Sequence, residues 1–330
     1  MERVLFNELY NEFERILLKS GFSREGSASC ARAFAENTRD GVQSHGIDRF
    51  PGFVDYVRRG LVDSKAEPAR LGGTGAIERW DGRRGAGILN ALFCMDRAVG
   101  LAAQHGIGCV GLRNTNHWMR AGTYGLRAAD AGCAGMCWTN TTGIMPPWGS
   151  SDPRLGNNPL VICIPRKPCH LLLDMAMSQF SYGRMARDAR QGNPLPVPGG
   201  FDEGGNLSDD PAAILRSRRP LPIGYWKGSG LAFMLDCLAA ILAEGDATAQ
   251  ISGRSDETGL SQVFIAVSLS PGGEHAASLD RIIDDLHAAV AITDASPVTY
   301  PGEAMYERRL EHERNGIPVD EETWRAIRRL

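Results

Sequence analysis

Two residues that could carry out chemistry together lie in the segment from Ser44 to Phe50, which reads SHGIDRF. The imidazole of His45 titrates near neutral pH, so it could give a proton to a carbonyl oxygen. Four residues later, Arg49 carries a guanidinium group that could bind a carboxylate through two parallel hydrogen bonds. The pair therefore predicts a site that protonates the carbonyl group of a substrate bearing a carboxylate.

Other polar residues follow apolar segments, at positions where ligands often bind. His117 comes shortly after an apolar strand, Asn140 follows a second one, and Asp174 closes a third. Lys227 lies at the start of an apolar helix, where free backbone N–H groups and a lysine could hold a phosphate. Each of these residues also has a structural interpretation, as a satisfied histidine, a helix N-cap or a solvated surface charge.

Hydrophobic periodicity predicts helices at both ends of the chain and alternating strands and helices between them. The expected helices span residues 5–18, 28–39, 49–59, 88–103, 124–131, 231–243, 279–290 and a stretch beginning at 321. The expected strands span residues 77–80, 107–112, 134–139, 159–164, 171–175 and 262–269. His45 falls at the junction between the second and third expected helices.

The order of these elements predicts an α/β (α+β) fold with a central mixed sheet and flanking helices. We expect residues 1–72 and 300–330 to form a helical lobe, and residues 73–299 to form a mixed-sheet region that carries the binding sites. Within that region, residues 192–224 begin with a Pro/Gly-rich stretch, which predicts a loop-rich cover.

Composition restricts the class of function. A formal charge of -3 gives no electrostatic reason to bind nucleic acid or an anionic membrane surface. Acidic residues interrupt the start of the chain where a secretory signal needs an apolar core, and the apolar stretch 231–243 is too short to span a bilayer.

Most of the eight cysteines lie in apolar runs, which favours buried reduced thiols in the cytoplasm. No Cys/His set has zinc-ligand spacing, so we predict no metal site.

The common cofactor and hydrolase motifs are missing from the sequence. Two Gly-x-Gly sequences, at 73–75 and 228–230, lack a third glycine in register, which argues against a Rossmann dinucleotide fold. The Walker A, Gly-x-Ser-x-Gly and His-Glu-x-x-His patterns are also missing. The polar clusters must therefore belong to a less common architecture.

Five motifs, taken together and in order, resemble the malate/L-lactate dehydrogenase family of the second type, which is unrelated to the Rossmann-fold lactate and malate dehydrogenases. The resemblance covers essentially the whole chain and rests on Ser44-His45-Gly46, Asn116-His117-Trp118-Met119-Arg120, Met145-Pro146-Pro147-Trp148-Gly149, Phe180-Ser181-Tyr182-Gly183 and Gly224-Tyr225-Trp226-Lys227-Gly228-Ser229-Gly230. It implies a non-Rossmann fold particular to the family and an NAD(P)-dependent oxidoreductase that reduces a small 2-oxo acid or related carbonyl compound. NAD(P)H is the implied cofactor, with NADH the expected form, and the implied assembly is a homodimer with sites near the subunit interface.

The resemblance also implies roles for individual residues. His45 matches the proton donor, Arg49 the arginine that meets the substrate, and His117 a second active-site histidine to which some relatives assign the acid/base role. With His117, Asn140 would complete the polar wall around the substrate. The implied cofactor contacts are His170, Leu171, Leu172, Leu173, Asp174, Met175, Ala176, Trp226, Lys227, Gly302, Glu303 and Ala304.

Some relatives extend the pair of motif serine and histidine into a relay with a downstream aspartate. In this chain the corresponding neighbourhood reads Gly183-Arg184-Met185, which offers no carboxylate. We therefore do not expect a three-member relay through Ser44.

Two alternatives stay open from the sequence. A sister dehydrogenase of the same family, acting on malate, lactate, ureidoglycolate or a cyclic imino acid, would share the lobes and His45. A non-catalytic binding protein on the same fold is a different class of answer, which the retention of His45, Arg49 and Lys227 disfavours.

Overall fold

A seven-stranded mixed sheet forms the centre of the computed structural model, which describes residues 2–269, 274–292 and 297–330. The strand order is β2-β3-β4-β10-β5-β6-β7, so β2 and β7 are the two edges. All neighbouring pairs are antiparallel except β3 and β4, which run parallel. The strands are β2 (Ala69–Thr74), β3 (Ile77–Asp81), β4 (Ile107–Thr115), β5 (Cys133–Thr139), β6 (Leu160–Ile164), β7 (Leu171–Met175) and β10 (Leu260–Ser268).

Side chains on opposite faces of this sheet enter different cores, because successive residues of a strand point to opposite sides. On β10, Phe264 and Ala266 pack with helices α4 (Gly87–His105) and α5 (Gly122–Asp130). Val263 and Ile265 on the same strand pack with α8 (Trp226–Ala243) instead. The sheet is therefore covered on both faces, by α4 and α5 on one side and by α8 on the other.

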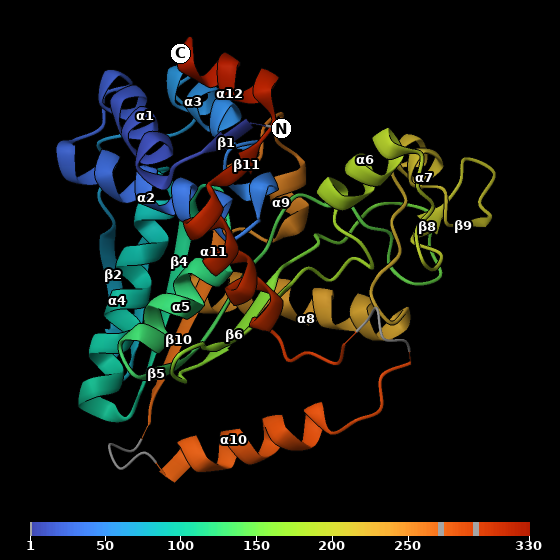
Figure 1. Cartoon of the computed structure of the whole chain (residues 1–330). Helices are drawn as coiled ribbons and strands as arrows, with labels where there is room; N and C mark the ends of the chain where they lie inside the picture. Colours follow the sequence, from blue (N-terminus) through green and yellow to red (C-terminus); the bar gives the residue numbers. More distant parts are fainter. Residues whose placement is uncertain (1, 270–273, 293–296) are drawn as a thin grey trace.

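The N- and C-terminal segments meet in one hydrophobic core. Strands β1 (Glu2–Val4) and β11 (Ile317–Val319) pair antiparallel, and Figure 1 marks both ends of the chain at the same end of the molecule as this pair. Three phenylalanine rings, Phe13, Phe34 and Phe50, pack against one another with centroids 4.3–6.1 Å apart. The helices here are α1 (Phe6–Lys19), α2 (Arg24–Arg39), the short 3₁₀ turn η1 (Gln43–His45), α3 (Phe50–Arg58), α11 (Glu303–Asn315) and α12 (Glu321–Arg328).

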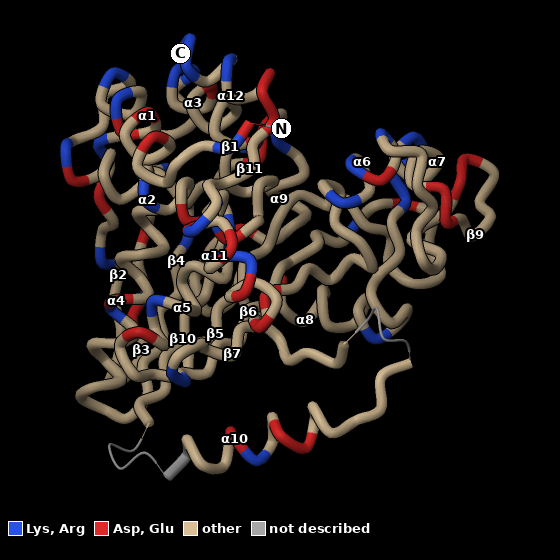
Figure 2. Tube along the Cα trace, viewed as in Figure 1, with Lys and Arg blue, Asp and Glu red and all other residues tan. Residues whose placement is uncertain are grey.

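The remaining elements lie between β7 and α11 in the chain. They are α6 (Tyr182–Gln191), β8 (Gly200–Phe201), β9 (Leu207–Ser208), α7 (Pro211–Ser217), α9 (Thr248–Ser252) and α10 (Glu274–His287). Residues 192–224, which we expected to be rich in loops, also contain α7 and the small β8–β9 pair. Figure 2 shows charges of both signs on the terminal helices, whereas the middle strands of the sheet carry few.

The central mixed sheet and its flanking helices are confirmed, as is every helix and strand that periodicity predicted, with shifted ends. Helix α2 begins four residues early, because the Ser23 side chain accepts a hydrogen bond from the Gly26 N–H and caps it. The division into lobes at residues 72 and 300 remains a prediction, and the terminal core also takes in Ile88 and Met119.

Helix α8 corrects one argument from the sequence. It begins at Trp226 rather than Leu231, so its 18 residues are long and apolar enough to cross a membrane by length and composition alone. The expected start of this helix at Leu231 was therefore five residues late. One face of α8 packs on the sheet through Ala232, Leu235 and Ala239, so this face of the helix is part of the hydrophobic core.

A buried carboxylate, Asp40, joins the segments that surround the centre of the molecule. Its oxygens accept hydrogen bonds from Arg309 on α11 at 2.9 and 2.7 Å, from Arg120 after β4 at 2.8 Å and from Arg39 at 3.0 Å. Arg120 also donates to the sulfur of Met305 on α11, and its Nε lies 3.7 Å from an oxygen of Asp174 on β7. The cluster thus ties the end of α2 to α11, to the loop after β4 and to the edge strand β7.

The charge state of Asp40 follows from these contacts. Burial alone raises the pKa of the carboxyl group, but hydrogen bonds and charge from Arg309, Arg120 and Arg39 outweigh burial and lower it to about 2. Because the folded pKa lies below the ordinary value of 3.8, the unfolded chain takes up a proton first on acidification. The stabilisation is complete above about pH 4 and is lost as the pH falls toward 2.

We predict that Asp40→Asn lowers the free energy of unfolding by about 3–5 kcal/mol at neutral pH, because it leaves buried guanidinium groups without their counter-charge. Urea denaturation followed by circular dichroism at pH 7 and pH 4 measures this effect. Asp55→Asn, which removes an exposed carboxylate paired with Arg59, is the matched control and should cost no more than about 1 kcal/mol. Equal losses for the two variants would contradict a central role for Asp40.

Candidate active site

The turn that carries His45 is held tightly against α2. The Asn37 amide donates to the His45 carbonyl oxygen at 3.0 Å, and the Ile47 N–H donates to the Thr38 hydroxyl at 2.9 Å. A Cβ at Gly46 would lie 2.4 Å from the Thr38 hydroxyl oxygen, so only glycine fits between them. This close approach explains the glycine of the Ser44-His45-Gly46 motif and fixes the backbone at His45.

The structure brings His45 and His117 together as a stacked pair, with ring centroids 5.7 Å apart and planes 13° from parallel. The Ser44 hydroxyl lies 3.2 Å from Nδ1 of His45, and the Met119 N–H donates to Nδ1 of His117 at 3.0 Å. Both Nδ1 atoms are therefore engaged by the protein, and each Nε2 is left for other partners. Because Nδ1 of His117 accepts a hydrogen bond, the neutral His117 ring carries its proton on Nε2.

The surroundings keep the two rings from being charged together. Burial lowers the pKa of His45, Arg49 and Arg120 lower it further, and only Asp174 opposes them. Burial lowers the pKa of His117 well below its usual range, and the charges of Arg49 and His45 add to this effect. Hence at most one of the stacked imidazoles holds an extra proton near neutral pH, and His45, which has a carboxylate nearby, is the more basic.

Arg49 lies close enough to both rings for its charge to lower the pKa values of both. It sits at the start of α3, is exposed, and has no carboxylate within salt-bridge distance among the described residues. A cation beside two imidazoles, without a protein counter-ion, is the arrangement expected for binding a substrate carboxylate. His45, His117 and Arg49 therefore form one cluster.

The third member of a relay is missing from this cluster. The side-chain position of Gly183 points at Ser44, since a Cβ there would lie 3.1 Å from the Ser44 Cβ and 3.5 Å from its hydroxyl oxygen. A residue with a carboxylate at this position could reach the serine, and glycine cannot. Asp174 is instead the carboxylate whose charge reaches His45, while its own Oδ2 accepts a hydrogen bond from the Gly122 N–H at 2.8 Å.

The three segments that the resemblance assigns to the cofactor all adjoin the edge strand β7. The first is β7 itself, within 170–176. At 302–304, Gly302 lies against β7, where the Leu172 N–H donates to the Pro301 carbonyl at 2.8 Å and a Cβ on Gly302 would meet the strand at 3.0 Å. The segment with Trp226 and Lys227 follows 221–223, which pairs with residues 177–179 just beyond β7.

This edge fits an extended dinucleotide. Since the Leu172 N–H points outward to Pro301, the backbone groups of Asp174, two residues further, face the same open edge. An edge strand with free backbone donors and acceptors can bind an extended ligand as it would bind another strand. Near the other end of β7, His170 is already held, since its Nδ1 accepts from the Arg166 N–H at 3.1 Å and its Nε2 lies 3.0 Å from Asp130. Both ring nitrogens of His170 therefore have partners within the chain.

Backbone strain is concentrated beside the proposed contacts. Tyr225, the residue before Trp226, has φ of 61° and ψ of -116°, and Met119, two residues after His117, has φ of 65°. Such conformations cost about 1–3 kcal/mol in residues other than glycine and persist where the surrounding structure imposes them. Their place beside His117 and Trp226 favours a functional role for both segments.

Asn140 does not belong to the cluster. Its amide nitrogen donates to Asp236 at 2.9 Å and to the Asp246 carbonyl at 2.7 Å, and its oxygen accepts from the Ser261 N–H at 2.9 Å. The side chain is fully buried, and its amide is already satisfied within the chain. A place for Asn140 in the wall of the substrate site stays a prediction, and position after a strand does not reveal whether an amide is already satisfied.

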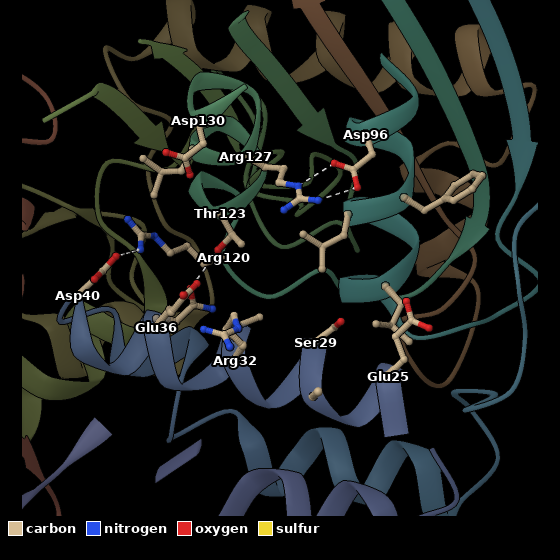
Figure 3. A pocket seen from close by; sticks show the side chains of 18 of the residues that line it. Glu25, Ser29, Arg32, Glu36, Asp40, Asp96, Arg120, Thr123, Arg127 and Asp130 are labelled. Carbon is tan, nitrogen blue, oxygen red and sulfur yellow. Dashed lines mark hydrogen bonds and ion pairs between the residues drawn. The ribbon is translucent and has the colours of Figure 1, made fainter. Parts of the chain in front are cut away.

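A large cavity lies away from the histidines. It has a volume of about 1110 Å³ and opens between α2, α4 and α5, as Figure 3 shows, with Arg120 reaching Asp40 at one end. Charged residues of both signs line it, including the paired Asp96 and Arg127. None of His45, His117 and Arg49 lines this cavity, so its size alone does not identify the reacting centre.

Reasoning from sequence missed the buried support of the cluster, namely Asp40 and Arg120. One signal was present in the sequence, because Asp40 is an acidic residue at the C-terminal end of a helix, where the helix dipole disfavours negative charge. An acid in such a position needs strong cationic partners. Arg120, in the loop that also carries His117, is one of them.

Comparisons with known proteins agree with this architecture. The family model described as malate/L-lactate dehydrogenase matches residues 4–328. A 2,3-diketo-L-gulonate reductase from Citrobacter koseri is 45% identical, covering 99% of this chain and 100% of the relative. Malate dehydrogenase from Entamoeba histolytica has the same fold, with a TM-score of 0.93 at 24% identity, covering 99% of this chain and 96% of the other. The delta1-piperideine-2-carboxylate reductase from Pseudomonas syringae gives a TM-score of 0.86 at 26% identity, covering 100% and 99%.

The match to nearly the whole chain and the full-length relative confirm the resemblance that five motifs predicted. The chain belongs to the malate/L-lactate dehydrogenase family and is an oxidoreductase.

Proposed function

We propose that the chain reduces 2,3-diketo-L-gulonate to 3-keto-L-gulonate with NADH, and that His45 gives the proton. The identity of 45% over the full length of a reductase named for this substrate supports the choice of substrate. The observation that carries the mechanism is the stacked pair of His45 and His117 beside the guanidinium group of Arg49, at the open edge of β7. A substrate that carries a carboxylate next to a carbonyl group matches this cluster.

Each residue of the cluster has a separate role in the reaction. Arg49 binds the substrate carboxylate and so orients the neighbouring C2 carbonyl toward His45. NADH held by residues 170–176, 226–227 and 302–304 would supply the hydride for the carbonyl carbon. His45 donates its Nε2 proton to the oxygen as negative charge develops there, while the Ser44 hydroxyl holds Nδ1. His117 stays neutral and donates a hydrogen bond from Nε2, since its pKa is too low for it to hold a second proton.

The cofactor is held by residues 170–176, 226–227 and 302–304, with His45 near the C-terminal end of β7. Two carboxylates near the start of β7 support NADH rather than NADPH as the cofactor. Asp130 contacts His170, and Glu303 begins α11 at the Gly302 turn. A carboxylate favours a ribose hydroxyl and repels a 2′-phosphate.

We also propose a cytoplasmic homodimer. Eight cysteines without disulfide partners support a reducing compartment.

Absorbance loss of NADH with 2,3-diketo-L-gulonate, compared with oxaloacetate, pyruvate and a cyclic imine, tests the substrate, because sister enzymes of the same fold act on other substrates. Faster turnover with one of the other compounds would replace the substrate and leave the mechanism unchanged.

We predict that His45→Ala lowers kcat for the reduction by about 10²- to 10⁴-fold, because the developing alkoxide loses its proton donor. NADH should bind unchanged in a fluorescence titration. His105→Ala, which removes an exposed histidine at the end of α4, is the matched control and should keep wild-type activity. Near-normal turnover of His45→Ala would remove His45 from the mechanism.

Arg49→Met should raise KM for the oxo acid by about 10- to 100-fold, since a charged hydrogen bond to the carboxylate is lost. The positive charge of Arg49 also holds the pKa of His45 down, so the variant should lose activity at a higher pH than wild type does. Steady-state kinetics from pH 5 to 8 measure both effects, with Arg58→Met on the same helix as control. An unchanged KM and pH profile would show that Arg49 does not face the site.

Lys227→Ala should weaken NADH binding by about tenfold, because one charged contact to the pyrophosphate is worth roughly 1.4 kcal/mol. Quenching of tryptophan fluorescence by NADH gives the dissociation constant. Lys19→Ala is the control, since this exposed lysine lies at the end of α1 and donates to the Leu330 carbonyl rather than lying near α8. A dissociation constant equal to wild type would place Lys227 outside the cofactor site.

A further inference from the structure

Helix α6, which Figure 1 shows beside α7, turns one face toward the turn that carries His45. A Cβ at Gly183 would lie 3.1 Å from the Cβ of Ser44, so the Gly183 side of the helix faces this turn. Met185 is fully buried and packs with Leu195 in a separate small core. Because an α-helix turns by about 100° per residue, Met185 lies on the side opposite Gly183. The helix therefore separates this small core from the segment that carries the proposed proton donor.

Two arginines lie on the same face of α6 as Gly183. Arg187 and Arg190 follow Gly183 by four and seven residues, a spacing that places them on one side of a helix. The surroundings of Asp48 agree with this placement, because burial raises the pKa of Asp48 and the charge of Arg190 lowers it. Asp48 follows Ser44 by four residues. Helix α6 thus runs along the turn, with Arg187 between Gly183 and Arg190.

Carboxylates of the protein only partly balance the guanidinium groups of α6. Arg187 and Arg184 share one carboxylate, that of Asp188, at 3.4 and 3.2 Å. Arg190 has no carboxylate within salt-bridge distance in the part of the chain that the structure describes. Arg187 and Arg190 are both exposed, so their N–H groups are open to a ligand. Together with Arg49, they leave an excess of positive charge beside the turn.

We propose that Arg187 and Arg190 bind the part of the substrate beyond its C2 carbonyl, and that they select 2-oxo acids whose remaining chain is rich in oxygen atoms. This inference rests on the proposed function, in which Arg49 binds the carboxylate and His45 protonates the carbonyl oxygen. A guanidinium group has five N–H donors, and hydroxyl, ketone and carboxylate oxygens all accept hydrogen bonds from it. The donors of Arg187 and Arg190 therefore match the C3 ketone and the hydroxyl groups of 2,3-diketo-L-gulonate.

An alkyl chain offers these two arginines no acceptor. A guanidinium group covered by such a chain loses water without gaining a hydrogen bond, which costs free energy. A site built to bind oxygen atoms therefore rejects a chain of the same length that lacks them. This selection differs from general electrostatic attraction, which favours every anion of the same charge alike.

Isothermal titration calorimetry with two unreactive acids, on the full chain with NADH present, tests this recognition without turnover. Gluconate and hexanoate each have six carbons and one carboxylate, but only gluconate carries hydroxyl groups along the chain. Wild type should bind gluconate at least tenfold more tightly than hexanoate. Arg187→Leu and Arg190→Leu should each weaken gluconate binding by about tenfold, because a hydrogen bond to a charged group is lost, and should leave hexanoate binding unchanged.

Arg216→Leu on α7 is the matched control. The side chain of Arg216 is 59% exposed, against 58% for Arg187, and it pairs with Glu203 rather than facing the turn. This variant should bind both acids as wild type does. Arg187→Lys keeps the charge but loses the fork of donors, so it should bind gluconate more tightly than Arg187→Leu and less tightly than wild type.

Steady-state kinetics extend the test to the reaction. The ratio of kcat/KM for 2,3-diketo-L-gulonate to that for 2-oxohexanoate should fall about tenfold in Arg187→Leu and in Arg190→Leu, through KM rather than kcat, since His45 is unchanged. Equal affinity of wild type for gluconate and hexanoate, or equal losses for both acids in the two leucine variants, would overturn the proposal. If gluconate binding depends on both arginines but no oxo acid oxidises NADH, the proposed function fails and the recognition by α6 stands.

Discussion

The ion cluster around Asp40 is the constraint on which the site depends. A carboxylate buried in a protein interior is costly unless cations and hydrogen bonds compensate for its lost hydration. Here the compensation comes from α11 and from the loop after β4, while Arg120 also approaches Asp174 on β7. His45 follows Asp40 by five residues, and His117 precedes Arg120 by three. Satisfying one buried charge therefore sets the relative position of the segments that carry the two imidazoles and the proposed cofactor edge.

The surroundings of His45 and His117 also decide which of the two imidazoles is protonated first. Two imidazoles stacked in a partly buried site repel when both are charged, and the nearby guanidinium groups strengthen this effect. The asymmetry comes from backbone geometry, because the Met119 N–H occupies one nitrogen of His117 while a hydroxyl that can donate or accept faces His45. The pair thus has a built-in order of protonation. Substrate chemistry can use the ring that titrates while the other remains a fixed donor.

Sequence patterns predicted the helices and strands in the middle of the molecule well, because the periodicity of apolar residues identifies buried strands and amphipathic helices. They failed for α11, whose charged residues surround the helix without an apolar stripe, and for β2, whose glycines hide a strand. His45 and Arg49 could be proposed from four-residue spacing, but their meeting with His117, some seventy residues away, was accessible only through family resemblance. Asn140 shows the opposite limit, since an amide saturated by Asp236, Asp246 and Ser261 looks in sequence like one that is free.

The position of β7 at the edge of the sheet has a consequence for solubility. An edge strand with free backbone groups is a template onto which another chain can add, and proteins usually protect such edges with charge or cover. On β7, Pro301 covers the strand at Leu172, and the carboxylate of Asp174 marks the stretch that stays open. The charge of the same side chain that influences His45 therefore disfavours pairing with another chain, so the edge proposed to hold the cofactor does not become a starting point for aggregation.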